Sequence, residues 1–158
     1  MKDGELGGRA EDIRIDIVDW PAAQARVVPL RMRVFVVEQG VPAEIELDEF
    51  DPQSRHAIAT DAGGGVVATG RLLPDGHIGR MAVDAAWRGC GVGGAVLEAL
   101  VAEAGAGGMA QALLNAQVQA LDFYRRHGFE EYGEVFIEAG IPHRAMRRTL
   151  AERRDGTG

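Results

Sequence analysis

A glycine-rich segment in the middle of the chain combines residue types that bind phosphate. Gly89, Gly91, Gly93 and Gly94 follow a short apolar run that ends at Val83, and apolar residues then recur at helical spacing. Glycine lets successive backbone N–H groups converge on an anion, and a helix N-terminus adds unpaired donors and a favourable dipole. The segment therefore predicts a phosphate site between a strand and a helix.

Two common phosphate loops fit this segment poorly. Residues 89–94 match the dinucleotide fingerprint G-x-G-x-x-G by letter, but that fingerprint follows a parallel strand directly and is followed by an acidic residue at the end of the next strand. Here five residues separate Val83 from Gly89, and the next predicted strand carries Asn115 instead of an acid. The Gly-Lys-Ser/Thr of a P-loop is absent. Two alternatives to a phosphate site of another kind stay open at this point. The protein could be a nicotinamide oxidoreductase, or the glycines could serve only in turns.

The segment Arg88-Gly89-Cys90-Gly91-Val92-Gly93, placed after an antiparallel strand, resembles the acyl-CoA pyrophosphate loop of the GNAT superfamily of N-acetyltransferases. Further segments occur in the order of the ElaA-like branch of that superfamily, and the resemblance covers roughly residues 13 to 150. These segments are residues 34–42, 46–51, 79–83, 114–117, 123–129 and 140–143. Together they identify the chain as similar to this branch.

The resemblance implies an α+β (mixed α/β) fold with a mostly antiparallel central sheet, splayed between strands 4 and 5, and flanking helices. The residue patterns predict the same kind of architecture, with the three strands between residues 55 and 83 as an antiparallel meander. We expect that Pro29 breaks the first helix into two pieces, that residues 41–53 form an acidic loop, and that a Gly140-Ile141-Pro142 turn joins the last two strands. The predicted strands are residues 13–17, 55–61, 66–73, 77–83, 110–118, 131–138 and 143–150, and the predicted helices are residues 20–29, 30–39, 91–104 and 119–127.

The resemblance also implies which residues bind acetyl-CoA. Main-chain groups of residues 81–83 would pair with the pantetheine arm in the gap between strands, and the N–H groups of residues 88–94 would hold the pyrophosphate. Asn115 would lie beside the cofactor. The expected cofactor-binding residues are Met81, Ala82, Val83, Arg88, Gly89, Cys90, Gly91, Val92, Gly93, Gly94, Asn115 and Tyr124.

By the same resemblance, Tyr124 would stabilise or protonate the departing thiolate. The nucleophile must be a neutral amine, so a base has to remove a proton; Glu38 is the first candidate, with His56 and His143 as alternatives on the acceptor side. The acids Glu44, Glu46, Asp48, Glu49 and Asp51 could attract a cationic acceptor or form a solvated face.

The expected activity is direct acetyl transfer from acetyl-CoA to a primary amine, of a small molecule or a peptide, in a ternary complex. The alternative is a non-catalytic acyl-CoA-binding module. Cys90 is the only cysteine, so neither an internal disulfide nor a cysteine-based metal site can form, and we expect no metal cofactor.

Length and composition are typical of one domain, which we place at residues 12–151 between flexible ends at residues 1–11 and 152–158. A net charge of -7 argues against nucleic acid as the main partner and favours cationic ligands. With no long apolar stretch and no signal peptide, we expect a cytoplasmic protein without membrane contact. The last strands could pair between the subunits of a homodimer.

Overall fold

The computed structural model describes residues 12–41 and 48–150. The expected flexible ends, and the acids Glu44 and Glu46, lie outside the described residues. The strands are β1 (Arg14–Val18), β2 (Arg55–Thr60), β3 (Val66–Leu72), β4 (Ile78–Val83), β5 (Gln111–Gln117), β6 (Glu130–Glu138) and β7 (Ile141–Thr149). The helices are α1 (Trp20–Arg31), a π-helix (Met32–Glu38), α3 (Val92–Ala106), α4 (Leu121–Arg126) and 3₁₀ turns at Asp51–Gln53, Ala85–Trp87 and Val118–Ala120. No described helix has the length and apolar character needed to cross a membrane.

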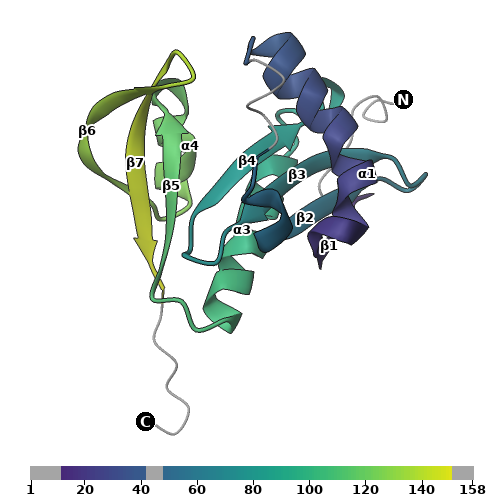
Figure 1. Ribbon diagram of the computed structural model, residues 1–158, viewed down its shortest axis with the longest axis horizontal. Helices are drawn as coiled ribbons and strands as arrows, with labels where there is room; N and C mark the ends of the chain where they lie inside the picture. Colours follow the sequence, from purple (N-terminus) through teal and green to yellow (C-terminus); the bar gives the residue numbers. More distant parts are fainter. Residues whose placement is uncertain (1–11, 42–47, 151–158) are drawn as a thin grey trace, which may run out of the picture.

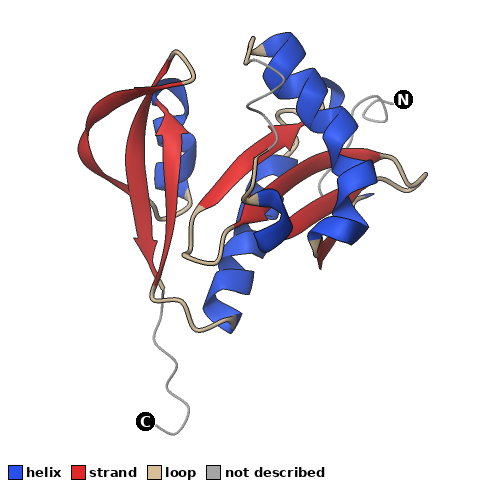
Figure 2. Cartoon of the chain, viewed as in Figure 1, coloured by secondary structure: helices blue, strands red, loops and turns tan. Residues whose placement is uncertain are grey.

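The strands form two antiparallel sheets, shown in red in Figure 2. The first has the order β1-β2-β3-β4, which confirms the predicted meander, and the second has the order β5-β7-β6. Helices cover both faces of the first sheet, because successive side chains of β2 point to opposite faces and pack against different helices. Ala57 and Ala59 belong to the apolar cluster around α3, whereas Ile58, between them, packs with Ala23 and Val27 of α1.

The two sheets separate between β4 and β5, as Figure 1 shows. In the described residues, a single isolated bridge between His77 and Leu113 joins the neighbouring edges. Beyond that bridge the two strands diverge, which confirms the expected splay between strands 4 and 5. Both strands therefore turn an unpaired backbone edge toward the gap.

The predicted helix break at Pro29 is wrong. Helix α1 begins after Asp19, whose carboxylate accepts the N–H of Ala22, and it continues through Pro29 to Arg31. The backbone then becomes π-helical, with the N–H of Gln39 donating to the carbonyl of Val34 at 3.1 Å. Proline removes only its own donor, and the burial of the apolar side chains around it favours a continuous helix.

Two predicted boundaries near the C-terminus also differ from the structure. Strand β5 ends at Gln117, so Val118 opens a 3₁₀ turn instead of ending the strand. The turn between β6 and β7 consists of Ala139 and Gly140, not of Gly140 to Pro142. Both turn residues have positive φ, 53° and 78°, which is the geometry of the tight hairpin turns that match strand twist.

A buried ion-pair network joins α1, the segment after residue 47, and the first sheet. Asp51 is 1% exposed and accepts two hydrogen bonds from Arg31, at 3.0 and 3.1 Å, and one from Arg71, at 2.9 Å. Arg71 also binds both carboxylate oxygens of Asp48, which receives a further bond from Arg80 of β4. Burial alone would raise the pKa of Asp51, but the hydrogen bonds from the two arginines lower it below 3.8. Asp48 and Asp51 therefore carry structural ion pairs and form neither a solvated face nor an unpaired attractor for cations.

We predict that Asp51→Asn destabilises the protein by about 3–5 kcal/mol, because it leaves two arginines without their buried partner. Asp16→Asn, which removes the exposed partner of Arg14, should change stability by less than about 0.5 kcal/mol. Urea unfolding measures both. Because the folded pKa of Asp51 lies below 3.8, its contribution is complete above that pH and is lost as the pH falls. Equal unfolding midpoints for the two variants at pH 7 would contradict the network's role.

Helix α3 packs closely against α4 at Gly94. A Cβ on Gly94 would lie 2.8 Å from Nε2 of His127. The imidazole is held in place, because its Nδ1 is 2.7 Å from the Glu98 carboxylate and its ring contacts Phe123. Arg148 of β7 also binds Glu98, and this cluster links α3, α4 and β7. Gly94 is thus required for packing between helices.

We expect Gly94→Ala to destabilise the protein by about 1–3 kcal/mol through overpacking. Gly105→Ala in the same helix is the matched control, because nothing lies within 4 Å of the added Cβ. That variant should be stabilised by up to about 1 kcal/mol through better helix propensity. Thermal or urea unfolding compares the two, and stabilisation by both substitutions would refute the packing argument.

Candidate active site

The glycine-rich loop leaves a row of backbone donors without partners. Gly89 has φ of 80°, and Gly91, the N-cap of α3, has φ of 90°, so both adopt a conformation that other residues avoid. No side chain caps the helix, and the first backbone bond that enters it runs from Ala95 to Gly91. Within the described chain, the N–H groups of residues 89–94 have no recorded acceptor. The loop therefore has the donor set of an anion site.

The open edge of β4 presents main-chain groups beside this loop. Asp84 donates its N–H to Val67, and Ala82 pairs with Thr69, so these residues face β3. By alternation, the main-chain groups of Met81 and Val83 face the gap between the sheets. Of residues 81–83, only Ala82 is turned away, and its side chain is 2% exposed under α1. The expectation that Ala82 contacts a ligand in the gap is therefore not supported by its orientation.

Arg88 connects the loop to the end of the π-helix. Its Nε donates to the carbonyl of Val83 at 2.9 Å, and a terminal nitrogen lies 2.6 Å from the Glu38 carboxylate. Glu38 does not line the cavity described below. Its carboxylate is held by Arg88 of the glycine-rich loop, so its position does not favour the expected role as the base.

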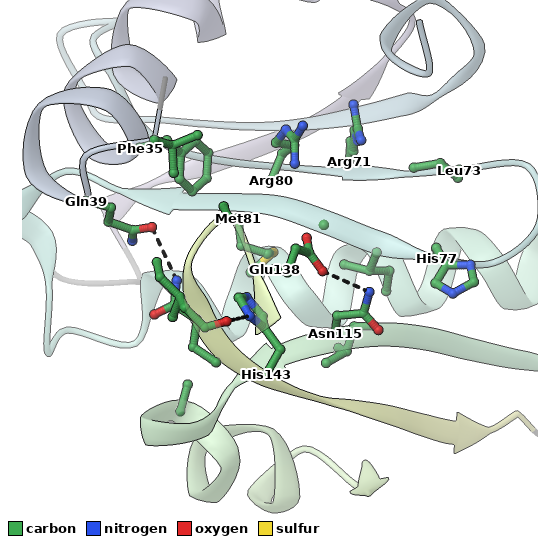
Figure 3. Close-up of a pocket in the computed structure, with 18 of the residues that line it drawn as sticks. Phe35, Gln39, Arg71, Leu73, His77, Arg80, Met81, Asn115, Glu138 and His143 are labelled. Atoms are coloured by element: carbon green, nitrogen blue, oxygen red, sulfur yellow. Dashed lines mark hydrogen bonds between the residues drawn. The ribbon is translucent and has the colours of Figure 1, made fainter. Parts of the chain in front are cut away.

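A cavity of about 620 Å³ opens between the sheets. Its lining residues come from the π-helix, β3, β4, β5, α4 and the β6–β7 hairpin, and Figure 3 shows how several of them converge on it. Gln39 and Gln117 close one side, where the amide of Gln117 donates to that of Gln39 at 3.2 Å. The cavity thus extends along the open edges of β4 and β5.

Tyr124 lies where α4 meets this cavity. It packs edge-on against Phe123, at a ring-centroid distance of 5.0 Å, and against Phe129, at 6.2 Å. Its hydroxyl has no recorded hydrogen-bond partner in the described part of the chain. Burial raises the pKa of Tyr124 above 10.0, so the hydroxyl stays protonated at neutral pH and can donate a hydrogen bond.

The two histidines predicted for the acceptor side lie in different places. His143 lines the cavity, and its Nδ1 is 2.6 Å from the carbonyl oxygen of Ile141. A carbonyl only accepts, so Nδ1 carries the proton and Nε2 of the neutral ring is left as an acceptor. His56 is 1% exposed, stacks near Trp20 and contacts the Asp51 carbonyl, and burial lowers its pKa. His56 therefore belongs to the core and does not reach the cavity.

Sequence reasoning missed three of the charged residues that line the cavity, Arg71, Arg80 and Glu138. Asn115, predicted to lie beside a cofactor, does line it, but its amide donates to Glu138 at 3.3 Å. Arg71 and Arg80 form part of the wall near Asp48. For Glu138, the sequence shows only that it comes immediately before a glycine-containing turn. That position predicts the tip of a hairpin, but it does not show which part of the molecule the tip contacts.

The chain is similar to known proteins in both sequence and fold. Residues 23–150 match the acetyltransferase (GNAT) domain family. An uncharacterized N-acetyltransferase of Bacillus subtilis, YjcF, is 41% identical over 122 residues, which cover 75% of this chain and 87% of the relative. A UPF0039 protein of Schizosaccharomyces pombe is 37% identical over 127 residues, which cover 77% of this chain and 84% of the relative.

Solved structures agree with these matches. An acyl-CoA N-acyltransferase of Pseudomonas aeruginosa is 31% identical with a TM-score of 0.78, covering 87% of this chain and 99% of that one. Escherichia coli ElaA is 28% identical with a TM-score of 0.77, covering 86% of this chain and 99% of that one. The fold, the uncapped glycine loop beside an open strand edge and the match over most of the sequence agree: the chain belongs to the GNAT family of acetyltransferases.

Proposed function

We propose that this protein transfers the acetyl group of acetyl-CoA directly to a primary amine, of a small molecule or a peptide, while both are bound in a ternary complex. The observation that carries the proposal is the continuity of one cavity, which runs along the open edge of β4 past Tyr124 to His143. This arrangement gives a cofactor and an acceptor adjacent places in the same space.

The residues present fit the cofactor that the family uses. The unpaired N–H groups of residues 89–94 would bind the pyrophosphate, and the gap-facing main-chain groups of Met81 and Val83 would pair with the pantetheine amides. Acetyl-CoA, when bound, supplies an acetyl group activated as a thioester. Arg88 would add a positive charge if it exchanged Glu38 for a phosphate.

Tyr124 would act as the hydrogen-bond donor at the leaving sulfur. Complete proton transfer from tyrosine to a thiolate of pKa about 8.5 is unfavourable by about 2 kcal/mol at the ordinary tyrosine value of about 10. The raised pKa of Tyr124 makes this transfer harder still. Donation of a hydrogen bond to the developing charge is therefore the role that its environment favours.

His143 would act as the base. A primary amine is mostly protonated at neutral pH, with a pKa of about 10.4 for a lysine-like group, so a proton must leave before nitrogen can attack. In the neutral ring, Nε2 of His143 is the available acceptor, because Nδ1–H is fixed on Ile141. Glu38, paired with Arg88 outside the cavity, becomes the second candidate.

We predict that Tyr124→Phe lowers kcat by about 100-fold while the affinity for acetyl-CoA changes less than about threefold, because the hydroxyl is needed only at the leaving group. Thiol release with an amine panel measures turnover, and calorimetric titration measures binding.

Tyr132→Phe is the control for this variant. Tyr132 is the second of the two tyrosines, lies under Arg147 at 5.0 Å, and does not line the cavity. It should leave both parameters unchanged. Unaltered turnover in Tyr124→Phe would remove Tyr124 from the mechanism, and loss of acetyl-CoA affinity alone would assign it to binding.

Cys90 gives an independent test of the cofactor loop. Its thiol is partly exposed beside the carbonyl of Arg88, and it is the only cysteine of the chain. We predict that saturating acetyl-CoA slows alkylation of Cys90 by about 10-fold or more, because the cofactor would cover the loop. NADH at the same concentration should not protect it. Labelling rates that are equal with and without acetyl-CoA would count against this loop as the pyrophosphate site.

The cytoplasmic location and the homodimer expected from the sequence stay predictions. Cell fractionation and light scattering would test them separately from the activity.

A further inference from the structure

The two acidic residues that line the cavity differ in whether they have an ion-pair partner. Two acids line it in the described residues, Asp48 and Glu138. Asp48 is bound by Arg71 and Arg80, so its charge is compensated. Glu138 makes no ion pair with any described residue, and its one hydrogen bond comes from the neutral amide of Asn115 to Oε1. One carboxylate oxygen, Oε2, therefore remains available to a ligand.

The shape of β6 places the exposed side chain of Glu138 among the residues that line the cavity. Tyr132 pairs with Ala145 and Phe136 with His143, so residues 133–135 of β6 all lie opposite the single residue 144 of β7. Gly133 within this bulge has φ of 77°, and its carbonyl accepts a hydrogen bond from Arg144 at 2.6 Å. Bulges bend a strand and change the direction of its side chains. Here the bend brings the hairpin tip back across β5, where Glu138 meets Asn115 (Figure 3).

Glu138 and His143 belong to the same face of the hairpin. Glu138 pairs with Ile141, and Phe136, two residues earlier on its strand, pairs with His143 and stacks on its ring at 5.9 Å. Side chains two residues apart on a strand share a face. The carboxylate and the histidine therefore both line the cavity from one rigid element.

The rest of the described wall combines apolar side chains with neutral polar ones and with the ion-paired Arg71 and Arg80. Apolar side chains from five elements or their ends contribute to it: Phe35, Phe50, Leu73, Met81 and Leu114 are among them. Glu138 is the one acid of the described wall without an ion-pair partner, so the wall matches one cationic group. A ligand that matches this wall has one positive charge and an apolar or aromatic body.

We propose that Glu138 binds the ammonium group of the acetyl acceptor and that the acceptor is a small monoamine carried on an aromatic or apolar group. This inference rests on the proposed acetyl transfer and names the class of its acceptor. The carboxylate accepts two N–H bonds from the ammonium. One proton then passes to Nε2 of His143, and the neutral amine that attacks stays hydrogen-bonded to Glu138.

Phenethylamine is the probe for this proposal. Calorimetric titration into the protein saturated with CoA should give a dissociation constant at least about 10-fold lower for phenethylamine than for phenylacetate, which has the same body and the opposite charge. Spermidine, with several charges and no aromatic group, should also bind more weakly. Stronger binding of phenylacetate or spermidine, or no binding of phenethylamine, would overturn the proposed acceptor class.

The substitution Glu138→Gln keeps the size and removes the charge. It should weaken phenethylamine binding by about 10-fold to 100-fold, the loss expected for a charge-assisted hydrogen bond, and should raise the KM for phenethylamine acetylation by a similar factor. Glu134→Gln is the matched control, because Glu134 lies exposed on the same strand within the bulge and does not line the cavity. Equal phenethylamine affinity in the wild type and Glu138→Gln would refute the role of Glu138.

Acetyl-CoA binding separates this test from the proposed function. The wild type, Glu138→Gln and Glu134→Gln should bind acetyl-CoA with the same affinity. Equal affinity would also show that the two variants are folded. If none of them binds acetyl-CoA, the proposed function fails. If acetyl-CoA binds and amines are acetylated but Glu138→Gln matches the wild type, only the inference about Glu138 fails.

Discussion

The separation of β4 from β5 is the constraint on which the rest of the structure depends. Backbone N–H and C=O groups in a strand need partners, and a sheet that opens in its middle leaves two edges without them. The protein satisfies part of this need internally, through Arg88 on the Val83 carbonyl. The remaining edge of β4 is what a ligand with amide groups can extend as an additional strand.

Two polar clusters hold the elements that flank the site in a fixed geometry. On one side, the carboxylate of Glu98 joins α3 to His127 and Arg148; burial alone would raise its pKa, but hydrogen bonds from these two residues lower it. On the other side, Asp48 and Asp51 hold arginines of α1, β3 and β4. The cavity thus lies between two rigid supports, so its side chains need little reorganisation when ligands bind.

Local patterns were sufficient for most of the fold and for the conformation of the glycine-rich loop. Alternation and turn residues predicted the meander, and the glycines predicted the loop, because both depend on residues near one another in sequence. The acceptor side depends on distant pairs, such as Arg31 with Asp51, 20 residues apart, and Asn115 with Glu138, 23 residues apart. No local pattern showed that Asp51 would be buried, that α1 would continue past Pro29, or that the exposed Glu138 on the bulged β6 would line the cavity. Such features follow from packing between elements, which a single sequence does not reveal.

The position of Arg88 has a consequence for communication between the two ends of the site. Its guanidinium already binds the Val83 carbonyl and the Glu38 carboxylate. An anion that bound Arg88 would replace the ion pair with Glu38, so the free energy gained would be only the difference between the two ion pairs. The backbone donors must then supply most of the affinity. When Arg88 moves to the anion, the Val83 carbonyl and the Glu38 carboxylate, 50 residues away in sequence, lose their partner at the same time. Occupation of the loop is thereby linked to the end of the π-helix, and thermodynamic reciprocity requires that changes at that helix alter the affinity of the loop in return.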